Sequence, residues 1–128
     1  MLRLVSSLAL AALATLHVTV HGAGEAAAQN TSFLLINGTA YPISTLEVSE
    51  SLMNIWTKNE LGAPPIKAGE RRQVRFNAPP TFCQADLKVG FADGGAPALW
   101  QNINLCTLTK IKLQYDRGTG LSTASYDD

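Results

Sequence analysis

Cys83 and Cys106 are the only cysteines of the 128-residue chain, and their thiols could form a disulfide, carry out redox chemistry or bind a metal. Catalytic dithiols usually lie in a C-x-x-C motif, whereas these two are 23 positions apart. Zinc and copper sites need further Cys or His ligands nearby, which the sequence does not supply. We therefore expect a structural disulfide; two free thiols are the alternative if the protein is not exported.

Nucleophilic catalysis is poorly supported, because the part of the chain that is expected to fold contains no histidine. His17 and His21 are the only two, and both precede the expected cleavage site described below. A Ser-His-Asp or Cys-His site needs a base whose pKa lies near neutrality. No serine lies in a G-x-S-x-G or S-x-x-K setting. The sequence therefore predicts a protein without catalytic residues of these classes.

Carboxylates are the remaining candidates for chemistry. Glu47, Glu60, Asp86 and Asp93 could include a pair suited to glycoside hydrolysis, which needs two acids about 5–10 Å apart, but their spacing in the sequence fixes no distance. Calcium needs several converging oxygen ligands, and the turn at Asp93 supplies a single carboxylate. We expect neither a metal nor another cofactor.

A basic segment, formed by Lys67, Arg71, Arg72 and Arg75, has the composition of an anion-binding or nucleic-acid-binding patch. In an extended strand its charges fall on both faces, and no aromatic side chains alternate with them as single-strand binders require. The whole chain has ten basic and ten acidic residues. We expect a solvated or edge-protecting strand and no nucleic-acid partner.

The first 28 residues have the composition of a secretory signal peptide. A short positive start precedes an uncharged, mainly apolar run over residues 4–20, and Ala26–Ala28 fits the rule for a signal peptidase site. A membrane anchor is the alternative, and cleavage after Gly22 is a second option for the processing site. We expect residues 29–128 to form one domain in the periplasm or outside the cell, with no membrane insertion after cleavage.

The expected elements are short strands separated by turns. Phe33–Ile36 is followed by Asn37-Gly38, which predicts a type I′ hairpin to the arm Tyr41–Val48. The alternation of that arm is imperfect, and a β-bulge near Ser44–Thr45 would correct it. Ser49–Leu61 is the one candidate helix, for which we expect one or two turns or an irregular loop.

The stretch from Cys83 to Cys106 predicts a second hairpin, with its turn at Asp93-Gly94-Gly95. A symmetric register pairs the two cysteines but places Asn102 and Asn104 beside core residues. A one-residue shift or a bulge would remove this conflict.

Turn signals divide the chain into six or seven short strands, which also include Arg71–Asn77 and Thr107–Tyr115. Leu121–Asp128 is either a short edge strand or a frayed tail. This pattern predicts an all-β, single-domain antiparallel β-sandwich, Ig-like or a small barrel, with at most one short helix.

Several features follow one another in a fixed order between Phe33 and Cys106: the turn Asn37-Gly38-Thr39, the strand end Leu46-Glu47-Val48-Ser49, Trp56 followed by Leu61, the turn Ala68-Gly69-Glu70, and the cysteine pair around Asp93-Gly94. This order resembles a loosely defined family of small exported bacterial β-rich proteins with one cysteine pair, mostly uncharacterised. The resemblance implies a β-rich exported domain and carries over no catalytic residue.

Together these observations predict a non-enzymatic exported protein of the bacterial envelope that binds an unknown envelope protein or small ligand. The candidate binding loop is Asp93-Gly94-Gly95. One alternative is a periplasmic inhibitor of a cell-wall enzyme, which should present a rigid polar loop at this turn or at Ser122–Tyr126. The second alternative is a carboxylate-based hydrolase or lyase.

Overall fold

The computed structural model describes residues 29–30, 32–78 and 83–127, and the expected signal peptide lies outside these ranges. Within them the chain forms strands and no helix. In chain order the strands are β1 (Gln29–Asn30), β2 (Phe33–Asn37), β3 (Ile43–Glu50), β4 (Arg71–Val74), β5 (Asn77–Ala78), β6 (Gln84–Phe91), β7 (Ala98–Asn104), β8 (Lys110–Asp116) and β9 (Leu121–Asp127).

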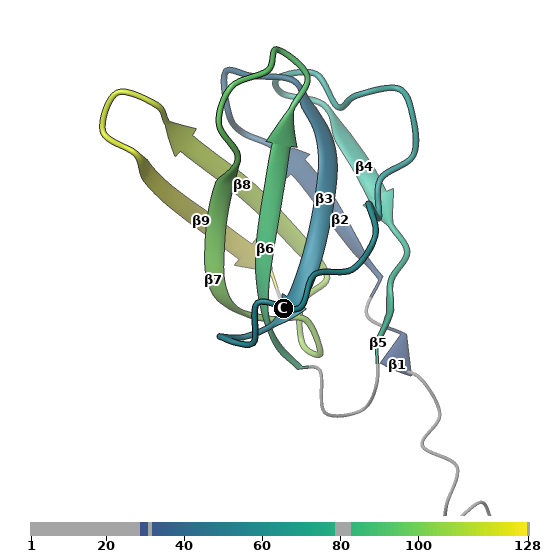
Figure 1. Cartoon of the computed structure of the whole chain (residues 1–128). Coiled ribbons are helices and arrows are strands. Elements are labelled where there is room, and N and C mark those ends of the chain that lie inside the picture. Colours follow the sequence, from purple (N-terminus) through teal and green to yellow (C-terminus); the bar gives the residue numbers. More distant parts are fainter. Residues whose placement is uncertain (1–28, 31, 79–82, 128) are drawn as a thin grey trace, which may run out of the picture.

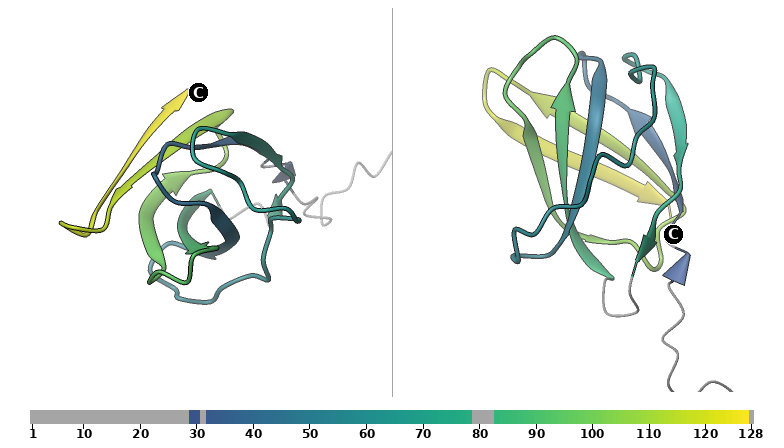
Figure 2. Two further views of the ribbon diagram at one scale, coloured as in Figure 1. Left: turned by 90° about the horizontal axis from the view of Figure 1, so that it is seen from above. Right: turned by 45° about the vertical axis from the view of Figure 1, so that its right-hand side comes forward.

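Seven of these strands form two sheets that pack face to face (Figures 1 and 2). One sheet has the order β4-β2-β8-β9 and the other the order β3-β6-β7, while β1 and β5 form a separate short pair. All neighbours are antiparallel except β2 and β8, which run parallel. The predicted all-β sandwich is therefore confirmed, and the two sheets do not join into a closed barrel.

The core lies between the two sheets and is made by alternate side chains of their strands. Phe33 and Leu35 of β2 and Ile111 and Leu113 of β8 are fully buried, and they face Leu87 and its neighbours in the other sheet. Each such side chain contributes about 1.5–3 kcal/mol when it is removed from water. A one-residue slip of any strand would expose its apolar set, so this pattern fixes the register.

The basic strand lies where the sequence indicated, at an edge. β4 is the outer strand of the four-stranded sheet and pairs only with β2 among the described residues. Arg71 is exposed, whereas Arg72 is half-buried and donates a hydrogen bond of 2.7 Å to the carbonyl oxygen of Gly62. The charged side chains therefore protect an edge strand from pairing with another chain.

The hairpin predicted at Asn37-Gly38 is wrong, because β2 and β3 belong to different sheets and the chain crosses between them. Asn37 is fully buried and uses all its side-chain hydrogen-bonding capacity in this crossing. Its Oδ1 accepts from the N–H (2.9 Å) and the hydroxyl (2.6 Å) of Thr39. Its Nδ2 donates to the carbonyl oxygens of Tyr41 (2.8 Å) and Ile66 (2.9 Å). The turn is thus set by a side chain that binds nearby backbone.

The candidate helix Ser49–Leu61 is an irregular loop apart from the end of β3. Leu52 and Asn54 have φ angles of 67° and 53°, which a right-handed helix does not contain. The bulge predicted near Ser44–Thr45 is confirmed, since the pairing of β3 with β6 shifts register between Ile43 and Thr45.

The second half of this loop covers the free edge of β3. The N–H of Thr57 donates to the carbonyl oxygen of Val48 (2.9 Å), and that of Glu60 donates to Leu46 (2.7 Å). In return, the side-chain oxygens of Thr57 and Asn59 accept from the N–H groups of Val48 (3.1 Å) and Leu46 (2.9 Å). The loop therefore replaces a neighbouring strand and closes an edge that would otherwise be open to pairing.

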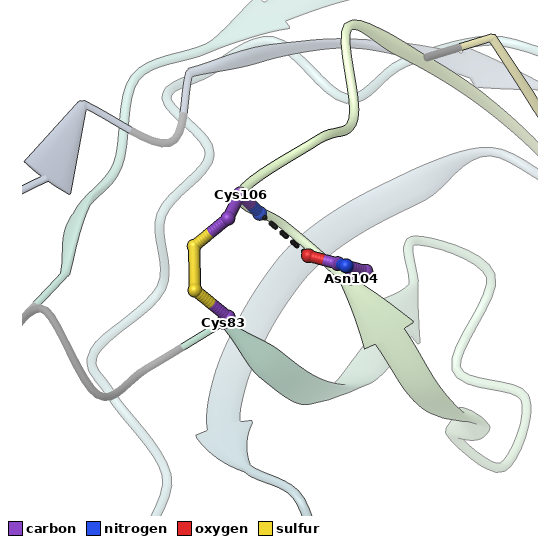
Figure 3. Close-up of a disulfide and its surroundings, with 3 residues drawn as sticks. All are labelled: Cys83, Asn104 and Cys106. Carbon is purple, nitrogen blue, oxygen red and sulfur yellow. Dashed lines mark hydrogen bonds between the residues drawn. A yellow bond between two sulfur atoms is a disulfide. The ribbon is translucent and has the colours of Figure 1, made fainter.

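Cys83 and Cys106 form the expected disulfide, with their Cα atoms 5.1 Å apart (Figure 3). The side-chain oxygen of Asn104 accepts a hydrogen bond of 3.0 Å from the N–H of Cys106 (Figure 3). The bridge joins the start of β6 to the segment that follows β7. A disulfide of this kind is compatible with an oxidising, exported location.

Replacing both cysteines (Cys83→Ser with Cys106→Ser) should lower the free energy of unfolding by roughly 3 kcal/mol, because the bridge restricts the unfolded chain over a separation of 23 residues. Urea denaturation followed by tryptophan fluorescence measures the change. Wild-type protein in the presence of a reducing agent is the control and should match the double variant. An unchanged midpoint for the variant would contradict a stabilising bridge.

Candidate functional site

The predicted binding loop Asp93-Gly94-Gly95 forms the turn after β6, and its charged side chain is held by Arg117 from the turn between β8 and β9. The two carboxylate oxygens of Asp93 accept from the terminal guanidinium nitrogens at 2.6 and 2.7 Å. The N–H of Gly95 donates to the same carboxylate at 3.0 Å. A Cβ atom at Gly95 would collide with the Arg117 guanidinium, so a side chain at this position would have to displace Arg117 from its place beside Asp93.

Arg117 fastens this turn to the core as well. Its guanidinium carbon lies over the ring of Tyr41 at 3.6 Å and over that of Phe91 at 5.1 Å. Phe91 stacks on Tyr115 with a centroid distance of 5.8 Å. The hydrogen bonds from Arg117, followed by that from the N–H of Gly95, lower the pKa of Asp93 to about 2. The predicted binding loop is therefore a fixed turn, and the carboxylate of Asp93 is bound to Arg117 and to the N–H of Gly95.

A second site, which the sequence did not predict, lies at the other end of β6 around Asp86. Only 2% of Asp86 is exposed, although its neighbours in the chain suggested an outward-facing side chain. Its carboxylate accepts three hydrogen bonds of 3.0 Å, from the hydroxyl of Ser51 and the N–H groups of Leu52 and Asn102. Asp86 thus joins the loop after β3 to the middle of β7.

Two of these donors belong to residues with unusual backbone conformations. Leu52 has a φ of 67° and Asn102 a φ of 58°, in the left-handed region that side chains other than those of glycine, asparagine and aspartate rarely adopt. Such residues cost on the order of 1–3 kcal/mol and persist where their surroundings hold them. The carboxylate of Asp86 stabilises both backbone conformations by accepting hydrogen bonds from the N–H groups of Leu52 and Asn102.

Asn102 also forms a β-bulge that explains the register of the cysteine hairpin. Ala85 pairs with Ile103 and Leu87 pairs with Trp100, so the register shifts on either side of Asp86. The extra residue turns Trp100 and Ile103 into the core and leaves Asn102 outside, as their exposed fractions show. The conflict noted in the sequence is therefore removed by a bulge, one of the two expected solutions.

The environment of Asp86 keeps it ionised at neutral pH. Burial raises the pKa of its carboxyl group, but the hydrogen bonds from the N–H groups of Leu52 and Asn102 and from the hydroxyl of Ser51 outweigh burial and lower the pKa below its ordinary value. A carboxylate with three fixed donors is suited to holding backbone in place, and poorly suited to accepting a proton.

Two adjoining pockets meet at Asn102, and we call them together the bulge groove. One pocket, of about 360 Å³, is lined by Ser51, Leu52, Asp86, Gln101 and Asn102. The other, of about 300 Å³, is lined by Asn102, Asn104, Thr107, Leu108 and Tyr126. Through this shared residue, the groove so defined includes side chains from the loop after β3, the bulge of β7 and the end of β9.

Several polar groups of the groove have no partner inside the described part of the protein. The side chains of Asn102, Thr107 and Tyr126 make no hydrogen bond there, and the amide nitrogen of Asn104 makes none either. The groove is flanked by exposed apolar surface, since Tyr126 is 52% and Leu52 79% exposed. Asp86 is its only charged lining residue among those described, and both of its carboxylate oxygens already accept hydrogen bonds. The groove thus offers neutral hydrogen-bonding groups and an aromatic ring.

A wider hollow of about 520 Å³ lies at the opposite end of the molecule, beside the turn that holds Asp93. Its two aromatic residues are Tyr41 and Tyr115, which are engaged by Arg117 and Phe91. Because these rings already serve the internal cluster, we regard the bulge groove as the better candidate for a ligand.

Neither a metal site nor a membrane span is found in residues 29–30, 32–78 and 83–127. No three Cys, His, Asp or Glu side chains in these ranges come together as ligands for an ion. No helix in the same ranges is long and apolar enough to cross a bilayer.

The variant Asp86→Asn should unfold with a free energy about 1–3 kcal/mol lower than that of the wild type at pH 7, because its amide cannot accept from all three donors. The native pKa of Asp86 is lowered, so its contribution is present above the ordinary value of 3.8 and is lost as the pH falls below it. The difference between variant and wild type should therefore shrink in acid. Urea denaturation at a series of pH values measures it.

Asn102→Gly is the matched control for this experiment. Glycine adopts a positive φ freely and retains the N–H that binds Asp86, so this variant should stay within about 1 kcal/mol of the wild type. Equal stability of Asp86→Asn and wild type at pH 7 would mean that the carboxylate does not hold the bulge.

Asp93→Asn should change how thermal stability depends on pH. The native pKa of Asp93 is about 2 and the ordinary value is 3.8, so the ion pair stabilises the fold fully above pH 3.8. This contribution is lost as the pH falls toward 2. The melting temperature of the wild type should exceed that of the variant at pH 5, and the two should converge near pH 2. Parallel pH profiles would contradict the pairing of Asp93 with Arg117.

A scan against protein-family models and searches of curated proteins and of solved structures found no match to this chain. The geometry of its own residues is therefore the basis for assigning a function.

Proposed function

We propose that this protein is a non-enzymatic, exported binding protein of the bacterial envelope, and that the bulge groove is its ligand site. The observation that supports this most directly is the set of polar side chains around Asn102 that line the groove without an internal partner. Polar groups that converge in a concave site beside apolar surface are typical of ligand pockets.

The groove is organised before any ligand arrives. The backbone of Asn102 is held by Asp86, and the amide oxygen of Asn104 is held by the N–H of Cys106. Tyr126 lies in β9, where it pairs with Ile111 of β8. Groups that are already fixed lose little conformational freedom on binding, which favours affinity. Strained backbone is also commonly kept at functional sites, and Asn102 fits that pattern.

Binding is favoured over catalysis by the state of the one carboxylate in the groove. Asp86 is ionised and accepts three internal hydrogen bonds, and no other acidic side chain appears among the described lining residues. A carboxylate-based hydrolase or lyase needs a second acid across the same cleft. A general acid or base would also need a pKa close to the working pH.

Export and family membership are part of the proposal. The apolar N-terminal segment and the disulfide between Cys83 and Cys106 support an oxidising compartment, either the periplasm or the exterior. The order of motifs supports a place in the family of small exported β-rich bacterial proteins.

Inhibition of a cell-wall enzyme is a second candidate function. Leu52, Met53 and Ile55 are 79%, 56% and 70% exposed on one loop, whose start is fixed by Asp86. A rigid loop that presents apolar anchors resembles the recognition surfaces of enzyme inhibitors. An inhibitor would use this loop, whereas a ligand-binding protein would use the groove beside it.

The proposal is tested by co-sedimentation of the purified exported protein with an isolated envelope fraction. Asn102→Gly combined with Tyr126→Ala removes two groove side chains and should reduce the bound fraction roughly tenfold, a loss of about 1.4 kcal/mol in binding free energy. Asn54→Gly combined with Leu121→Ala is the matched control, because Asn54 has a similar φ and Leu121 is an exposed residue of the same strand as Tyr126.

The control variant should bind as the wild type does. Equal binding by the groove variant and the control, or no binding of the wild type to any envelope fraction, would contradict the proposal. Loss of binding in a Met53→Ser, Ile55→Ser variant alone, which leaves the groove residue Leu52 in place, would favour the inhibitor function.

A further inference from the structure

We infer that the ligand of the bulge groove is a neutral saccharide, with one sugar ring against Tyr126 and its hydroxyl groups on the side chains of Asn102, Asn104 and Thr107. This inference rests on the proposed function and names the chemical class of the ligand.

The first argument is the chemistry of the lining. Asn102 presents a side-chain amide that both donates and accepts, Thr107 presents a hydroxyl group, and Asn104 presents a free amide nitrogen. Sugar hydroxyl groups also donate and accept at the same atom, so they match this set. No basic side chain lines either pocket in the described part, which disfavours phosphorylated or acidic ligands.

The second argument is the position of Tyr126. Its side chain is 52% exposed and lines the same pocket as the two asparagines. An aromatic ring is a rigid apolar surface with a polar hydroxyl at its edge. One face of a sugar ring carries C–H groups that pack on such a surface, while the hydroxyl groups around the ring point outward to hydrogen-bonding partners.

The third argument is the direction of the asparagine amides. The amide oxygen of Asn104 is bound to the N–H of Cys106, so its amide nitrogen is left to donate (Figure 3). The disulfide fixes the chain two residues further on. The backbone of Asn102 is fixed by Asp86 in the same way. The Asn104 amide and the backbone that carries the Asn102 amide are therefore anchored, which lowers the entropy lost when a weakly binding ligand is captured.

The fourth argument is size and continuity. A pocket of about 300 Å³ lies at the small end of ligand sites and suits a single ring. At Asn102 it adjoins the pocket of about 360 Å³, where Gln101 supplies a further amide and Leu52 an apolar wall. An oligosaccharide of several units would therefore continue across the bulge.

An extended peptide fits the same groove less well. A peptide that adds to β7 as a strand needs an uninterrupted row of backbone donors and acceptors. The bulge breaks that row, because the N–H of Asn102 is turned toward Asp86. The bulge thus removes the backbone recognition that peptides use and leaves side-chain recognition in its place.

The test uses the purified exported protein and three neutral probes: the tetramer of β-1,4-linked N-acetylglucosamine, cellotetraose and maltotetraose. Two-dimensional amide NMR should show shifts of the side-chain NH₂ signals of Asn102 and Asn104 with at least one probe, with a Kd of about 1 mM or lower. A response to the N-acetylglucosamine tetramer would indicate a cell-wall glycan as the source of the ligand. A response to one of the two glucose tetramers would indicate an exopolysaccharide.

Tyr126→Ala and Asn102→Gly should each weaken binding roughly tenfold, and Leu121→Ala and Asn54→Gly should leave it unchanged. Tetra-alanine serves as a peptide control in the same titration. Absence of shifts with every saccharide at about 10 mM, or a response of the same signals to tetra-alanine only, would overturn the saccharide inference. In either case groove-dependent binding to the envelope fraction would still stand and would keep the proposed function; loss of that binding as well would defeat both.

Discussion

The carboxylate of Asp86 makes the hydrogen bonds on which the end of the molecule with the bulge groove depends. It takes its three hydrogen bonds from the loop after β3 and from the bulge of β7, so a single buried charge joins three segments that are remote in the sequence. Without it, Leu52 and Asn102 would relax from their left-handed backbone conformations. The exposed loop, the bulge and the groove between them are therefore consequences of one side chain.

Much of the fold could be read from local pattern. The alternation of Ile111 and Leu113 with charged neighbours predicted β8, because one face of the strand meets the core and the other meets water. The strand predicted over Arg71–Asn77 is shorter in the structure, since β4 ends at Val74 and Asn77 begins β5. The hairpin predicted at Asn37-Gly38 was wrong because the strands that pair with β2 are distant in the sequence. β2 lies between β4 and β8, and no local signal reveals that a strand will be central. Asn37 serves the crossing through its side chain instead.

The groove was harder to predict than the fold. In the sequence Asp86 alternates with Gln84 and Lys88 and has the pattern of a solvent-facing residue; it is buried only because the chain near Ser51 folds over it. The left-handed turn at Leu52 carries no sequence signal, since leucine rarely adopts it. One signal was present. The register conflict at Asn102 pointed to a bulge, and bulges are common beside functional sites.

The strand order β4-β2-β8-β9 has a consequence for the time at which the protein can fold. β2 ends at Asn37, yet its parallel partner β8 begins only at Lys110. The four-stranded sheet thus lacks its central pairing until β8 has been synthesised, and such distant pairing is slow to form. The segments from β3 to β7 are therefore made before the four-stranded sheet can assemble, so the topology itself sets β8 as the strand that this sheet must wait for.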